Sequence, residues 1–348
     1  MHRFTAFRRV VSLALLLLLT GTAVHAQHDQ RKSGKRSKPF TLLEQGSFFV
    51  GGTIVDRAVT STTPNDTRFG PGEIAINAMY VQYQIPNDQK YRYPIVMIHG
   101  GGHSAKVFET TPDGREGWYT SFMRRGFSPY AVDAPNRGRS GWDPTQRFLV
   151  TLGIAAPSTL EAANIYSKQA AWTAFRVGPT FGVRYPGQQF PSEFYDKYIK
   201  ESIPAYRDPT QNPKIAAALA ELIDQIGPCI LLGWSTGGRN AFDAAALRPN
   251  LVKGIIGIEP GGTPDITKTA SIPMFLIQGD NTSPAGLHTI AAQVRAAGGD
   301  ATSLWLPDAG IFGNGHTMMA EHNNEQIADL IEDWVKEHVP GVRGHYRR

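Results

Sequence analysis

The chain has 348 residues, enough for one large α/β domain or two modest ones, and its composition is that of an ordinary globular protein. Its formal net charge is +5, but that positive charge is concentrated at the two ends. Residues 1–26 hold three arginines, residues 27–38 a net four positive charges, and the residues after 342 three more arginines, which leaves residues 39–342 at −5. A segment with this net negative charge gives no reason to expect nucleic acid as a partner.

The first 26 residues have the pattern of a signal peptide. A basic start precedes a nearly apolar run over residues 10–19, and small residues end the segment at Ala26. The apolar run is short for a membrane span, so we expect cleavage after Ala26, no stable membrane anchor, and a secreted or periplasmic protein. Residues 27–38 are polar and charged, which predicts a disordered basic tail. Cys229 is the single cysteine, so no intramolecular disulfide is expected.

Short apolar runs alternate with helix-type segments along most of the chain. Strands are expected at residues 46–55, 76–85, 93–98, 128–133, 228–232, 252–258, 272–277 and 301–306, the first two of them antiparallel. Helices are expected at residues 118–125, 214–226, 239–247, 287–297 and 321–339. This alternation predicts an α/β fold with a mostly parallel sheet and helices on both faces.

The alternation stops at residues 143–212. This segment has no clear strand and is rich in aromatic and turn-forming residues, and a structureless connection of that length is unusual inside a compact domain. We interpret it as an inserted cap with short helices of its own, between core segments 39–142 and 213–348. Most of its aromatic side chains are expected to form the core of the cap, and some to line a pocket for an apolar substrate group.

The pentapeptide Gly233-Trp234-Ser235-Thr236-Gly237 follows an apolar run and precedes a helix-type segment. This context is typical of a nucleophile elbow, in which a tight strand-to-helix turn exposes the serine hydroxyl and a side chain at either glycine would clash. Without such a context, Gly-x-Ser-x-Gly also occurs by chance in ordinary loops.

A serine nucleophile needs a histidine base and an acid that orients the base. His316 lies in a glycine-rich loop between the last expected strand and helix, where the chain order Ser, acid, His places the base, and His322 is the alternative. For the acid, Glu259 directly follows the expected strand at residues 252–258, and Asp280 follows Gln278-Gly279 after the expected strand at residues 272–277. We favour Glu259 for its longer reach and rigid, glycine-rich context, and keep Asp280 as the alternative.

The remaining candidates concern the oxyanion and metals. The backbone amide of Thr236, after the nucleophile, and a backbone amide at Gly101 in His-Gly-Gly-Gly are the expected oxyanion donors. His99 and His103 match no metal-ligand spacing, so a structural or tautomer-setting role is expected for His103. We expect no cofactor and no metal.

Taken together, His-Gly-Gly-Gly, Gly-Trp-Ser-Thr-Gly and Gly-Asn-Gly-His resemble the motifs of the α/β-hydrolase superfamily from about residue 45 to 340. More narrowly, segments 110–118, 133–140 and 258–261 resemble the secreted bacterial esterase 713-like subfamily, known for a Ser-His-Glu triad. The resemblance implies Ser235, His316 and Glu259 as the triad, with Gly101 and Thr236 as the oxyanion hole. The chain has Gly101-Gly102 where that esterase has adjacent cysteines, so properties tied to those cysteines do not carry over.

The expected activity is hydrolysis of a small-molecule carboxylic ester with an apolar group, through an acyl-enzyme. The alternatives are acyl transfer by the same triad and, in a different class, a catalytically silent hydrolase fold that acts as a binding module. Acyl transfer differs in its products, and a silent module does not react with a fluorophosphonate probe.

Overall fold

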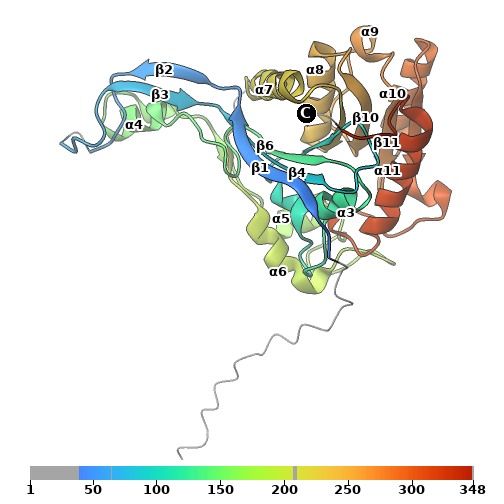
Figure 1. The fold of residues 1–348 in the computed structure, drawn as a ribbon. Coiled ribbons are helices and arrows are strands. Elements are labelled where there is room, and N and C mark those ends of the chain that lie inside the picture. The colour runs from blue at the N-terminus through green and yellow to red at the C-terminus, as the bar shows by residue number, and fades with distance from the viewer. Residues whose placement is uncertain (1–38, 64, 207–209, 347–348) are drawn as a thin grey trace, which may run out of the picture. The chain divides into compact units, whose positions relative to one another are not determined.

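An eight-stranded, mostly parallel sheet forms the centre of the computed structural model, which describes residues 39–63, 65–206 and 210–346 (Figure 1). The strand order is β1-β4-β6-β5-β9-β10-β11-β12. Strand β4 is antiparallel to both of its neighbours, and the strands from β6 to β12 run parallel. These strands are β1 (Leu42–Val50), β4 (Met79–Pro86), β5 (Ile95–Ile98), β6 (Pro129–Asp133), β9 (Cys229–Trp234), β10 (Val252–Ile258), β11 (Met274–Gln278) and β12 (Ala301–Trp305).

Helices cover both faces of this sheet, as predicted. The α-helices of the described residues are α2 (Lys106–Glu109), α3 (Trp118–Arg124), α4 (Thr145–Thr151), α5 (Lys168–Ala174), α6 (Tyr195–Tyr198), α7 (Gln211–Ile226), α8 (Thr236–Leu247), α9 (Ile266–Thr269), α10 (Ala285–Ala296) and α11 (Asn324–His338). In β5, Val96 and Ile98 belong to the hydrophobic cluster that includes α7, α8 and α10, whereas Ile95 and Met97 belong to the cluster that includes α3 and α11. Successive side chains of a strand point to opposite faces, so one buried strand supports two helical layers.

The beginning of the chain differs from the sequence prediction. The expected strand at residues 46–55 is two strands, β1 and β2 (Thr53–Arg57), separated by Gly51 and Gly52. Both glycines have positive φ, 63° and 78°, which a continuous strand does not accommodate. Strand β3 (Gly72–Ile76) pairs antiparallel with β2, in a stretch where the sequence predicts no strand before Ile76. Its five residues are too few for a clear alternation of apolar and polar side chains.

Residues 143–212, the inserted segment, contribute no described strand to the main sheet. The segment contains α4, α5 and α6 and two very short strands, β7 (Ala163–Asn164) and β8 (Ala205–Tyr206), which pair with each other. Its aromatic side chains form a separate hydrophobic cluster with α5 and α6, made of Ala171, Trp172, Phe175, Val177, Phe190, Tyr195 and Tyr198, together with Ala320. Its role as a cap stays a prediction.

The predicted signal peptide (residues 1–26) and basic tail (residues 27–38) lie outside the described residues. Within residues 39–63, 65–206 and 210–346, no helix has the length and apolar character needed to cross a membrane. Cys229 is a free, fully buried thiol at the start of β9, as expected for a small core side chain.

Candidate active site

Ser235 occupies the single-residue turn between the end of β9 and the beginning of α8. Its backbone angles are φ 54° and ψ −123°, a sparsely populated conformation for a residue with a Cβ. The N–H of Ser235 donates to the carbonyl of Ile258 at 3.0 Å, and its carbonyl accepts from Gly238 and Gly261 at 2.9 and 2.7 Å. These bonds to α8, to β10 and to the loop after β10 hold the turn in place.

The two glycines of the pentapeptide are required by close backbone contacts. A Cβ on Gly233 would lie 2.4 Å from the carbonyl oxygen of Gly237. A Cβ on Gly237 would lie 2.2 Å from the carbonyl oxygen of Ile98, at the end of β5. Real Cβ atoms do not approach backbone oxygens this closely, so the clash predicted from the motif is confirmed.

His316 lies beside the residue that precedes Ser235. The carbonyl of His316 accepts the indole N–H of Trp234 at 2.6 Å, and the centroids of the two rings are 5.3 Å apart. The Nδ1 atom of His316 is 2.5 Å from Oε2 of Glu259. His322, the alternative base, instead faces Asp113 with an Nδ1 to Oδ2 distance of 3.7 Å.

Glu259 follows β10 directly and has a positive φ of 44°. Its backbone N–H donates to the carbonyl of Ile277 at 2.8 Å, which ties the residue to β11. While Oε2 faces His316, Oε1 accepts the backbone N–H of Gly279 at 2.9 Å and an N–H from the guanidinium of Arg176. Both carboxylate oxygens are therefore held by specific donors.

Asp280, the alternative acid, has a different set of contacts. Its Oδ2 accepts the backbone N–H of Gly313 at 2.7 Å, and its own backbone N–H donates to the carbonyl of Asn314 at 2.7 Å. Asp280 therefore braces the loop that carries His316, and the structure brings His316 together with Glu259.

Glu259 stays ionised at neutral pH. Burial acts to raise the pKa of its carboxyl group, but the hydrogen bond from His316 and the charges of His316 and Arg176 outweigh burial and lower the pKa. A fixed carboxylate next to Nδ1 orients the imidazole, leaves Nε2 as the basic atom, and stabilises the imidazolium when Nε2 takes a proton.

Two backbone segments meet near Ser235. A Cβ on Gly101 would lie 3.5 Å from Oγ1 of Thr236, so the loop after β5 and the start of α8 are in contact. His99 fixes this loop, since its Nδ1 donates to the carbonyl of Gly100 at 2.8 Å while its Nε2 accepts the N–H of Ala134 at 3.1 Å. Burial lowers the pKa of His99 to about 4, so its ring is neutral at physiological pH.

His103 has a comparable structural environment. Its Nδ1 bonds the carbonyl of Gly101 at 3.1 Å, and its ring makes an edge contact with Trp234 at 5.0 Å between centroids. Burial lowers the pKa of His103 to about 4. Across the described part of the chain, no group of three or more His, Cys, Asp or Glu side chains is placed to hold a metal ion.

Comparison with known proteins gives the family. The family model described as "Alpha/beta hydrolase family" matches residues 95–340. The chain belongs to the alpha/beta hydrolase family. The solved structure of a bacterial esterase is similar to this hydrolase, with a TM-score of 0.82 and 36% sequence identity, covering 87% of this chain and 98% of that chain. The "Probable secreted lipase phiG" of Fungal sp. (strain ATCC 74256) is 28% identical over an alignment of 325 residues, and the match covers 74% of this chain and 85% of the relative.

Glu321 is a residue of the hydrolase site that sequence reasoning did not identify. It is fully buried, and its carboxyl group accepts the backbone N–H of Gly315 at 2.7 Å and the side-chain N–H of Asn314 at 2.6 Å. The sequence placed Glu321 in the first turn of the last helix, but α11 begins at Asn324, which leaves Glu321 free to hold the loop before His316. Burial raises the pKa of Glu321 to about 8.

Replacing Glu321 with glutamine is expected to change how the stability of the hydrolase depends on pH. The folded protein retains the Glu321 proton up to about pH 8, whereas the unfolded chain releases it near 4.5. The folded state therefore binds more protons in this window, and the free energy of unfolding falls as pH rises, by at most about 1.4 kcal/mol per pH unit. Urea unfolding at pH 5, 6.5 and 8 should show a smaller fall for Glu321→Gln than for the wild type.

The matched control for this experiment is Glu337→Gln, at an exposed position of α11. This control is expected to keep the wild-type dependence of unfolding free energy on pH. Equal slopes for Glu321→Gln and the wild type would contradict the assignment of a retained proton to Glu321.

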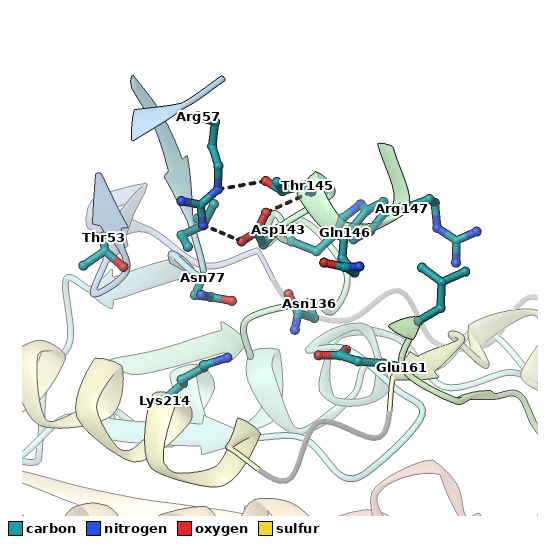
Figure 2. Close-up of a pocket in the computed structure, with 13 residues that line it drawn as sticks. Thr53, Arg57, Asn77, Asn136, Asp143, Thr145, Gln146, Arg147, Glu161 and Lys214 are labelled. Atoms are coloured by element: carbon teal, nitrogen blue, oxygen red, sulfur yellow. Dashed lines mark hydrogen bonds and ion pairs between the residues drawn. The ribbon is translucent and has the colours of Figure 1, made fainter. Parts of the chain in front are cut away.

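A pocket of about 480 Å³ is enclosed by the β2–β3 pair on one side and by the beginning of the inserted segment and the start of α7 on the other (Figure 2). Arg57 projects into it and is held by Asp143 and by the hydroxyl of Thr145, both at 3.0 Å. The lining residues include neither Ser235 nor His316. This pocket is therefore separate from the proposed nucleophile and its base.

Proposed function

We propose that this hydrolase cleaves carboxylic esters through an acyl-enzyme intermediate, with Ser235 as nucleophile, His316 as base and Glu259 as the acid of the triad. The observation that carries the proposal is the 2.5 Å contact between Nδ1 of His316 and Oε2 of Glu259, beside the strained serine turn. The similarity of the chain to a bacterial esterase and to a protein named as a lipase supports an ester as the substrate.

The proposed reaction has two halves. Ser235 Oγ attacks the acyl carbonyl while His316 Nε2 takes the hydroxyl proton, and that proton is then given to the alcohol that leaves. Water, deprotonated by His316, attacks the acyl-enzyme and releases the carboxylic acid. The ionised Glu259 stabilises the imidazolium in both halves. The steps need no cofactor.

We propose that the backbone N–H groups of Gly101 and Thr236 donate to the negatively charged oxygen of each tetrahedral intermediate and stabilise it. These residues lie in the two backbone segments that meet at the turn, and a glycine and a first helical residue both leave their N–H groups accessible. Tetrahedral oxyanions need two such donors in fixed positions.

The small-molecule substrate is an ester with an apolar group, in keeping with the aromatic side chains of Phe175 and Tyr166 close to His316 and Gly102.

We further propose that the enzyme acts outside the cytoplasm, as a secreted or periplasmic protein. The basic start, apolar run and Ala26 of the first residues support export, as does the name of the secreted lipase relative. The exported protein should then begin at Gln27 when its N-terminus is sequenced, and a chain that begins at Met1 would contradict cleavage.

The test of the proposed function is covalent labelling by a fluorophosphonate probe. The probe phosphorus is expected to bond Oγ of Ser235 with loss of fluoride, and peptide mass mapping should place the adduct on Ser235. Labelling should run in parallel with loss of activity on a p-nitrophenyl ester. An unlabelled protein would point instead to a silent hydrolase fold that binds without reacting.

A further inference from the structure

Arg176 brings a positive charge from the inserted segment onto the carboxylate that faces His316. The residue lies two positions after the end of α5. Its Nη2 forms an ion pair with Oε1 of Glu259, and its Nε donates to the carbonyl of Asp280 at 3.0 Å. The side chain of Arg176 is 15% exposed and that of Glu259 only 4% exposed, so the pair is largely shielded from water.

The neighbouring residue, Phe175, contacts the base. Its carbonyl accepts the backbone N–H of His316 at 2.9 Å, and its ring stacks on the imidazole with centroids 5.7 Å apart and planes 12° from parallel. The same carbonyl would lie 2.6 Å from a Cβ on Gly315, so the two backbones are in close contact. Two consecutive residues of the inserted segment therefore hold both the base and the acid.

The backbone of Arg176 is itself in a strained conformation. Its φ is 57°, which is uncommon for a residue with a side chain. The carbonyl of Arg176 accepts an N–H from the side chain of Gln188 at 2.7 Å, and its N–H donates to Thr173 at 3.1 Å. Residues held in such conformations cluster at functional sites, and Ser235 and Glu259 also have positive φ.

We propose that Arg176 is a positioning residue for the triad, which fixes Glu259 with one oxygen facing His316 and holds it as a carboxylate. The proposal rests on the proposed function. Buried ion pairs contribute little net stability on average, because desolvation offsets the attraction, so stability alone is a weak reason for this pair. The inserted segment then takes part in catalysis as well as in shaping the substrate pocket.

Other titratable groups face the same pair and remain in place when Arg176 is replaced. Glu321 interacts electrostatically with Glu259 and Arg176, and His103 interacts with His316. Asp280 contributes its carbonyl to Arg176 while its carboxylate bonds Gly313. Loss of the Arg176 cation removes an interaction that lowers the pKa of Glu321, so Glu321 keeps its proton in Arg176→Met and adds no charge on the acidic limb of the pH profile.

The experiment compares Arg176→Met, which removes the charge, with Arg176→Lys, which restores it in a different shape. For Arg176→Met we expect kcat to fall about 10- to 100-fold and KM to change less than about threefold, because the triad and not the substrate is misplaced. Loss of the cation also removes its repulsion of the imidazolium form of His316. The acidic limb of the pH profile of kcat/KM should then move up by about 0.5 to 1 pH unit.

Arg176→Lys should return the acidic limb close to the wild-type position while recovering only part of kcat, since lysine cannot reproduce the two-point contact of the guanidinium. The matched control is Arg184→Met, which removes an exposed arginine of the same segment that bonds Ser192 and not the triad. This control should leave kcat and the pH profile unchanged.

A second readout does not depend on ester turnover. The imidazole of His316, followed by NMR during a pH titration, should shift its midpoint in Arg176→Met in the same direction as the pH profile. Unchanged kcat, pH profile and titration in Arg176→Met, with Ser235 still labelled by the fluorophosphonate, would overturn the positioning role alone. Absence of labelling in the wild type would instead overturn the proposed function, and the titration would still decide whether Arg176 acts on His316.

Discussion

Replacing Ser235 with alanine is expected to lower kcat/KM for ester hydrolysis by roughly 10⁴- to 10⁶-fold, the largest effect of any single substitution in this site. Alanine lacks the oxygen that bonds the acyl carbon, so His316 has no hydroxyl to deprotonate and no acyl-enzyme forms. The residual rate would come from water attacking an ester that is still bound and still faces the oxyanion donors. The measurement is the steady-state rate on p-nitrophenyl esters of different acyl lengths.

The fold should be unaffected by Ser235→Ala. Serine and alanine share the Cβ, so the strained angles at residue 235 are equally unfavourable for both, and the backbone bonds to Ile258, Gly238 and Gly261 remain. Thermal unfolding of the variant and the wild type should therefore coincide to within a few degrees. A variant that is folded and retains more than a tenth of wild-type activity would contradict Ser235 as the nucleophile.

The sequence was sufficient for the part of the site that depends on local backbone geometry. The turn at Ser235 could be predicted because Gly233 and Gly237 are the residues that tolerate such close backbone contacts. The alternation of strands and helices likewise predicted the mostly parallel sheet. The prediction was wrong at the beginning of the chain, where Gly51 and Gly52 separate β1 from β2 and where β3 forms in a stretch predicted to hold no strand.

Contacts between distant segments could not be predicted in the same way. Arg176 and Glu259 are 83 positions apart, and no local pattern marks an arginine of the inserted segment as the partner of a carboxylate after β10. Glu321 gave no signal either, because it was assigned to a helix that begins three residues later. Both contacts depend on how the inserted segment and the loop before His316 fold onto the sheet, which is a tertiary property.

The choice between Glu259 and Asp280 shows the same limit. Both follow parallel neighbouring strands, β10 and β11, so their Cα atoms reach the same edge of the sheet. The difference lies in side-chain direction: Glu259 has a positive φ of 44° and faces His316, whereas Asp280 bonds the backbone of Gly313. The reach of the glutamate side chain and its glycine-rich context favour Glu259, and direct measurement can separate the two carboxylates.

Glu259→Gln is therefore expected to lower kcat by about 10³- to 10⁴-fold, whereas Asp280→Asn should lower it less than about tenfold. His316 Nδ1, Gly279 and Arg176 all supply N–H groups to the carboxylate. In glutamine one carboxylate oxygen is replaced by an NH2 group, which is itself a donor and cannot accept these N–H groups. The imidazole then loses its anionic partner and the tautomer that leaves Nε2 basic. Asparagine at 280 keeps an acceptor for Gly313, so the loop retains its anchor.

The assay should pair kcat with NMR detection of the Nδ1–H proton of His316, which resonates far downfield when it is held by a carboxylate. That resonance should be present in the wild type and in Asp280→Asn and absent from Glu259→Gln. The reverse pattern, with activity and resonance lost in Asp280→Asn and kept in Glu259→Gln, would assign the acid to β11 instead of β10. It would also remove the reason for Arg176 to act on the triad through Glu259, so this pair of variants tests the carboxylate on which both proposals depend.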